Sequence, residues 1–188
     1  MMKFRKIIIL LFIMSLWGGT MLFANSATQK VRVVINGLEN DETGILSEGK
    51  TYLPLRQIVS SLQAIVVWDD GNKRASIFKP NVHMFLFQDQ KIFGNVNKGK
   101  KYTFNVFSQI DNLKTEISAV KVAIVDPSGK EEMIQSENIP EQKDNFWFAT
   151  KEIRYGFDFS GKYTVRFYMK PSGSEEWVLV SEKTITSQ

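Results

Sequence analysis

The 188-residue chain contains no cysteine and one histidine, His83. Without a thiol, the chain can form no disulfide, thiolate metal site or lipid-modified cysteine anchor. A single imidazole cannot supply the several histidines of a copper or zinc site. A serine triad would need His83, and no Gly-x-Ser-x-Gly motif occurs in the sequence. We therefore predict a protein that is not an enzyme, with no catalytic residues, no metal site and no cofactor.

The acidic residues do not reverse this prediction. Glycosidases need two carboxylates that face each other from separate elements. Here the paired acids are adjacent in sequence and fall in expected turns, at Asp41-Glu42, Asp69-Asp70, Glu131-Glu132 and Glu175-Glu176. The segment after Asp69 also lacks the ligand spacing of a calcium loop. No glycine-rich phosphate loop or dinucleotide fingerprint is present.

The chain begins with the layout of an export signal. Residues 1–6 include three basic residues, residues 7–17 are apolar except for Ser15, and small residues follow at Ala24, Ser26 and Ala27. This order is typical of a secretory signal peptide, which we place at residues 1–24. Cleavage fits after Ala24 or after Ser26. The alternative is an uncleaved membrane anchor, because the apolar stretch is near the lower length limit of a spanning helix.

Removal of this signal changes the charge of the chain. The 24 basic and 20 acidic residues of the full sequence become 21 and 20, because Lys3, Arg5 and Lys6 leave with the signal. A nearly neutral protein is a poor candidate for nucleic-acid binding. The 14 phenylalanines, 5 tyrosines and 4 tryptophans can supply a core without disulfides. Export without cysteine favours a Gram-positive bacterium as the source.

Residues 29–79 have the pattern of a small α+β module. Residues 31–35 are β-branched and predict a strand, followed by the turn signal Asn36-Gly37. Leucine, isoleucine and valine recur with helical spacing over residues 55–62, after Pro54 at the helix start. Residues 65–78 then read as a hairpin. We expect the helix to cover one face of a sheet, with Tyr52 and Trp68 in the core.

These residues carry a resemblance to the copper amine oxidase N-terminal domain-like family, a "stalk" module of secreted Gram-positive proteins. The most specific part is Gly49-Lys50-Thr51-Tyr52-Leu53-Pro54-Leu55-Arg56, at the family's distance from Trp68-Asp69. The resemblance implies a stalk, spacer or adhesion module. It implies no oxidase chemistry, because copper and quinone belong to a different domain of the oxidases. Gln63 departs from the family pattern, which has glycine at this left-handed helix end.

Residues 83–188 show short alternating apolar runs separated by turn residues. Tyr163, Val165, Phe167 and Met169 alternate with polar or exposed positions, and no stretch has a helical period. Six or seven such strands in about a hundred residues are typical of an Ig-like β-sandwich. The segment from Asp158 to Tyr163 resembles the turn before a tyrosine corner. The predicted fold class is therefore a small N-terminal α+β module followed by an all-β Ig-like sandwich.

Two aromatic residues are candidates for a ligand or partner surface. Trp147 lies between Phe146 and Phe148, so it faces away from the core if the phenylalanines face inward. Tyr168 is out of phase with Phe167 by the same argument. Exposed aromatic rings on a sheet can stack on sugars or anchor a protein. The alternative is that both rings pack beneath a loop or against the first module.

The sequence thus predicts a secreted, non-catalytic binding or adaptor protein of the cell envelope, located outside the cell or on the wall. Its expected partner is cell-wall polysaccharide or another exported protein. Membrane contact is expected only through an uncleaved signal. The open alternatives are a structural, self-assembling envelope protein and a secreted protein of the protease-inhibitor type.

Overall fold

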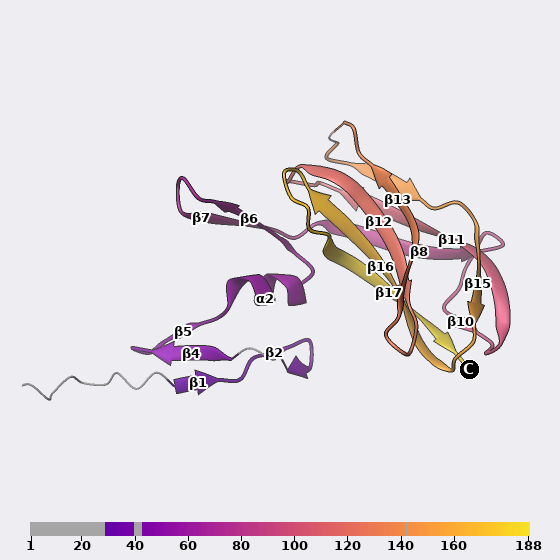
Figure 1. The fold of residues 1–188 in the computed structure, drawn as a ribbon, viewed down its shortest axis with the longest axis horizontal. Helices are drawn as coiled ribbons and strands as arrows, with labels where there is room; N and C mark the ends of the chain where they lie inside the picture. Colours follow the sequence, from indigo (N-terminus) through magenta and orange to yellow (C-terminus); the bar gives the residue numbers. More distant parts are fainter. Residues whose placement is uncertain (1–28, 40–42, 142) are drawn as a thin grey trace, which may run out of the picture. The chain divides into compact units, whose positions relative to one another are not determined.

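The computed structural model describes residues 29–39, 43–141 and 143–188 (Figure 1). The predicted signal segment, residues 1–24, lies outside the described residues. The fold is mostly β-strand with one short helix, which confirms the predicted combination of an α+β module and a sandwich. Contacts within the chain define two compact units, which are divided between Pro54 and Leu55. The domain boundary predicted near Lys79 stays a prediction.

The described part of the first unit is a small antiparallel sheet with one further hairpin. Strands β1 (Gln29–Val31), β4 (Gly44–Ser47) and β5 (Lys50–Tyr52) form the sheet in the order β1-β4-β5. Strands β2 (Val34–Ile35) and β3 (Leu38–Glu39) pair separately. The predicted turn between them forms with positive φ at both central residues, 53° at Asn36 and 80° at Gly37. These angles suit the two-residue hairpin turn that Asn-Gly favours.

The only helix among the described residues is α2 (Leu55–Ser61), where the sequence predicts it. Of its apolar residues, Val59 is buried, whereas Leu55 stays exposed. The helix ends in a Schellman motif: the N–H of Ala64 donates to the Val59 carbonyl (3.0 Å), and the N–H of Gln63 donates to the Ser60 carbonyl (2.9 Å). Gln63 has φ of 54°. The left-handed helix end therefore forms although glycine is absent. No described helix is long and apolar enough to cross a membrane.

Strands β6 (Ile65–Asp69) and β7 (Arg74–Phe78) form the predicted hairpin. Ile65 is fully buried and belongs to the main hydrophobic cluster. The expectation that Tyr52 and Trp68 fill a small core is wrong, because their side chains are 55% and 48% exposed. The Trp68 indole instead donates a hydrogen bond to Asp70 at the surface (3.1 Å).

The sandwich consists of two sheets (Figure 1). The first has the order β10-β17-β16-β12-β13, comprising Asn95–Val96, Val178–Ser187, Gly161–Pro171, Ile117–Val125 and Glu131–Asn138. The second has the order β14-β11-β8-β9, comprising Phe146–Ala149, Lys100–Asp111, Asn81–Gln88 and Lys91–Ile92. Strand β15 (Ile153–Phe157) also pairs with β11. Two mainly antiparallel sheets enclosing one core define this architecture.

The long strand β11 has two successive neighbours on one side. Its residues 100–104 pair with β15, and its residues 107–110 pair with β14. Thr150 bridges the step between them, because its N–H donates to the Val106 carbonyl and its hydroxyl accepts from the Val106 N–H, each at 2.9 Å. The backbone polar groups of Val106 are therefore satisfied although neither neighbouring strand reaches them.

The sandwich core follows the predicted alternation. Along β16, Tyr163, Val165, Phe167 and Met169 are all buried. The N–H of Phe159 donates to the Tyr163 hydroxyl at 2.9 Å, which completes the expected tyrosine corner. Side chains of alternate residues point to opposite faces of a sheet, so each sheet also has an outward face. These two outward faces hold the two candidate residues.

Candidate functional site

The outward face of the β14-β11-β8 sheet carries a row of aromatic rings. We call this the aromatic face and define it by Phe85 and Phe87 on β8, Phe107 on β11 and Trp147 on β14. Their sequence neighbours Met84, Leu86, Val106 and Phe148 are buried in the core. The alternation of a strand therefore directs these four rings outward.

The register of the strands brings the four rings together. Phe85 and Phe107 are direct partners across β8 and β11. The rings of Phe107 and Trp147 are stacked, with centroids 5.9 Å apart and an interplanar angle of 23°. Those of Phe85 and Phe87 are 6.2 Å apart. Trp147 is 67% exposed, so one large ring surface faces solvent while Phe107 supports it from one side.

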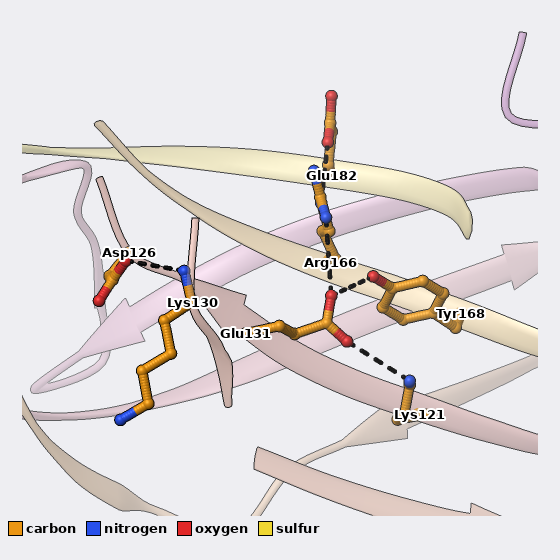
Figure 2. A network of polar contacts seen from close by, with 7 residues as sticks. All are labelled: Lys121, Asp126, Lys130, Glu131, Arg166, Tyr168 and Glu182. Atoms are coloured by element: carbon orange, nitrogen blue, oxygen red, sulfur yellow. Dashed lines mark hydrogen bonds and ion pairs between the residues drawn. The ribbon is translucent and has the colours of Figure 1, made fainter. Parts of the chain in front are cut away.

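The outward face of the other sheet is charged, as Figure 2 shows. Glu131 is at its centre: its carboxylate lies 3.5 Å from the Lys121 ammonium and 3.6 Å from the Arg166 guanidinium, and it accepts a hydrogen bond from Tyr168. Arg166 also lies 3.6 Å from Glu182. Four neighbouring strands, β13, β12, β16 and β17, each contribute to this chain of contacts. It links these strands across the sheet.

Tyr168 is held within this network and is only half exposed. The Lys121 ammonium lies 4.2 Å from the centroid of its ring, a cation–π contact that covers ring surface. Burial first, and then the hydrogen bond to Glu131, raise the pKa of Tyr168 to about 12. A ligand role for Tyr168 stays a prediction. Because it lies on the opposite sheet from Trp147, one flat surface cannot include both.

The other residues weighed from the sequence have local roles. The Asp69 carboxylate accepts from the backbone and side-chain nitrogens of Asn72, at 3.1 and 2.8 Å, which holds the β6–β7 turn together. The side-chain hydrogen bond from Asn72 is the main reason that the pKa of Asp69 is lowered. His83 is exposed on β8, opposite Gln109 of β11.

Residues 34–125 match the family model described as copper amine oxidase N-terminal domain. This part of the chain is similar to the copper amine oxidase N-terminal domain. The match confirms the resemblance and extends beyond it, through β8 and β11 to the end of β12. No curated protein matches the chain.

In amine oxidases, the copper amine oxidase N-terminal domain is the non-catalytic domain. The residues of the present segment do not fit a copper ion. Copper(II) sites in proteins use several imidazole or thiolate ligands, with methionine as a weak axial ligand, and the sequence supplies only His83 and no cysteine. Over the described residues, no group of three or more histidines and acidic residues lies close enough to hold a metal.

Sequence reasoning identified Trp147 on the aromatic face but missed Phe85, Phe87 and Phe107. The sequence does indicate that Phe107 faces outward, because it follows Thr103 and Asn105 at the alternate positions of the same strand. Phe85 and Phe87 gave no such signal, because the apolar run 84–87 is equally compatible with either face pointing inward.

Proposed function

We propose that this protein is an exported, non-catalytic binding protein of the cell envelope that holds wall polysaccharide on its aromatic face. The observation that carries the proposal is the 67% exposed ring of Trp147, stacked on Phe107. A single exposed aromatic residue is ordinary on a protein surface. Here the exposed Trp147 lies beside three further outward rings that are half-buried, and neighbouring apolar side chains on one surface are a feature of binding sites in soluble proteins.

The chemistry of the aromatic face suits sugars. An aromatic ring offers a flat, polarisable surface to the C–H groups of a pyranose ring, and it loses little conformational entropy on binding. Strands β8, β11 and β14 hold the rings in a fixed ladder, and sites on regular elements are more accurately positioned than sites on loops. A row of aromatic rings on one sheet face therefore favours a sugar chain that lies along the sheet.

The location outside the cell rests on the N-terminal layout, which is typical of a signal peptide. The absence of cysteine from the sequence is compatible with a wall environment, because no disulfide has to form after export. The similarity of residues 34–125 to a non-catalytic domain supports a binding role rather than a catalytic role.

The first experiment is a pull-down with purified Gram-positive cell wall. The chain that begins at Asn25 is compared with its Trp147→Ala variant and with Met133→Ala. Met133 is a matched control, because it is 61% exposed but lies on β13 of the other sheet. We expect the wall to retain the wild type and Met133→Ala, and to release most of Trp147→Ala. The fold should be unaffected, because truncating an exposed side chain changes stability little.

Two results would contradict the proposal. If the wall does not retain the wild type, wall binding fails. If Trp147→Ala is retained like the wild type, the aromatic face is not the binding surface. Size-exclusion chromatography of the same samples tests the self-assembly alternative, since sheet-on-sheet association through the aromatic face would give a dimer that the Trp147→Ala substitution dissociates.

A further inference from the structure

The aromatic face ends in a polar cleft at Phe87. The cleft has a volume of about 300 Å³ and is lined by Phe87, Asp89, Gln90, Thr103, Asn105 and Glu152. It is open to solvent and close to the size of the smaller ligand pockets in proteins. Phe87 belongs both to the aromatic row and to the cleft, so the two features form one continuous surface.

Strand register explains why the polar groups gather here. Asn105 on β11 is the direct partner of Phe87 on β8, and Thr103 is the next outward position on β11. The two-residue turn between β8 and β9 presents Asp89 and Gln90, whose φ angles of 47° and 61° form the left-handed turn that joins hairpin strands. Such angles are unfavourable for residues other than glycine, so a tight turn is maintained here at some cost.

The lining groups are hydrogen-bonding groups of the kind that recognise hydroxyls. Asn105 and Gln90 each offer an amide donor and acceptor, Thr103 offers a hydroxyl, and Asp89 and Glu152 offer carboxylate acceptors. Over the described residues, neither carboxylate forms an ion pair. Both remain available to a ligand.

The charge of the cleft selects among glycans. Its lining contains two carboxylates and no lysine or arginine. Arg154 is the register partner of Thr103 but lines a different cleft, together with Lys101 and Lys130. A ligand with phosphate or uronate groups would place like charges beside Asp89 and Glu152, which lowers affinity.

We propose that the aromatic face and this cleft form one extended site for a neutral, linear glycan chain. Sugar rings stack on Trp147–Phe107 and on Phe85–Phe87, and the hydroxyls of one further sugar bind in the cleft. This inference rests on the proposed function and narrows its ligand to an uncharged polysaccharide.

The test is isothermal titration calorimetry on the chain that begins at Asn25. The neutral probes are soluble oligosaccharides of β-1,4-linked N-acetylglucosamine and of β-1,4-linked glucose, and the anionic probe is an oligogalacturonate of matched length. We expect the wild type to bind at least one neutral probe and to bind the anionic probe at least about tenfold more weakly, which corresponds to roughly 1.4 kcal/mol.

Variants separate the two parts of the site. Trp147→Ala should remove stacking, and Asn105→Ala should remove a cleft hydrogen bond, with affinity for the neutral probe falling about threefold to tenfold in each case. Glu152→Lys should improve binding of the anionic probe. Glu137→Gln is the control, because this exposed carboxylate lies on β13 of the other sheet and should change neither affinity.

The outcomes distinguish this inference from the proposed function. No binding of either neutral probe, equal affinity for the anionic probe, or unchanged affinity in Asn105→Ala overturns the inference. If the cell wall still retains the wild type in that case, the binding role stands and only the neutral-glycan site is wrong. If a neutral probe binds but the wall retains nothing, the glycan site stands and the envelope role is wrong.

Discussion

Trp147 and Tyr168 show how two outward aromatic residues of one sandwich acquire different environments. Trp147 has only another ring beside it, so its surface faces solvent. Tyr168 has a carboxylate at its hydroxyl and an ammonium over its ring, from Glu131 and Lys121. Strand alternation sets the direction of both side chains. Long-range neighbours on adjacent strands then decide which of them stays available to a ligand.

The environment of Tyr168 gives a pH prediction at the residue scale. The pKa of Tyr168 and that of Tyr155 are both raised to about 12, mainly by burial, from an ordinary value near 10. A raised tyrosine pKa stabilises the folded state fully below about pH 10, and this contribution is lost as the pH rises toward 12. We expect phenolate absorbance to show a late phase above pH 10 that is smaller in Tyr168→Phe.

The variant Glu131→Gln provides a second check on the same residue. Glu131 raises the pKa of Tyr168, so its neutralisation should move the late phase to lower pH without abolishing it, because burial is the larger cause. Ionisation of every tyrosine near pH 10 in the folded protein would show that the ring is not enclosed as described.

At the scale of elements, hydrogen bonding at the ends of helices and strands compensates for unfavourable residues. The helix α2 is closed by Gln63, which adopts a left-handed conformation. Glycine would adopt this conformation without strain. The ammonium of Lys79 donates to the Gln63 carbonyl at 3.0 Å, which adds a contact from the end of β7. The edge strand β13 has two features that discourage pairing with another chain. Its register with β12 shifts after Val122, and it carries several acidic residues.

The substitution Gln63→Gly should stabilise the second unit. It relieves left-handed strain of about 1–2 kcal/mol but adds about 0.5–1 kcal/mol of unfolded-state entropy, so we expect a net gain of about 0.5–1 kcal/mol. Urea denaturation measures this as a higher midpoint at unchanged slope. The matched control is Gln57→Gly inside α2, which should lose about 1 kcal/mol. A destabilising Gln63→Gly would mean that the side chain itself supports the helix end.

The elements were predictable wherever one face of the pattern is apolar and the other polar. The helix at 55–61, the hairpin after Ile65 and the strand containing Tyr163 are confirmed on that basis. The burial of Trp68 and Tyr52 could not be predicted, because the burial of a strand with one apolar face depends on which element covers that face. These two aromatic side chains stay exposed because the strands that carry them do not build the expected core.

The candidate site was predictable only in part, for a similar reason. Trp147 lies between two core phenylalanines, so a single strand fixes its direction. Phe85 and Phe87 lie in an apolar run with Met84 and Leu86, and only the pairing with β11 shows which of these side chains face outward. The cleft joins the β8–β9 turn to Glu152, residues that are distant in sequence and share no motif.

At the scale of the whole molecule, the net charge is consistent with the proposed location outside the cell. Removal of residues 1–24 leaves 21 basic and 20 acidic residues. A neutral chain has little long-range attraction for polyanions. Specificity for a wall component would then come from the aromatic face and its cleft rather than from overall charge.

Export predicts a defined N-terminus. When the full chain is expressed in a Gram-positive host, we expect mass spectrometry of the culture supernatant and wall fraction to find a form that begins at Asn25 or Ala27, as the two cleavage positions require. Ala24→Arg should reduce processing after residue 24, because a small residue is needed there. A full-length chain that stays in the membrane fraction would support the anchor alternative instead.

The shared strand β11 has a consequence for how the protein reaches its folded state. Its partners β8, β14 and β15 come from both earlier and later parts of the chain, so β11 cannot complete its hydrogen bonds until the segment up to Phe157 is available. Closing such loops costs entropy before any contact forms. All-β domains dominated by distant pairings fold in milliseconds to seconds, far more slowly than helical bundles. In the proposed export, a chain that emerges N-terminus first would therefore leave β11 without all its partners until the segment up to Phe157 had crossed the membrane.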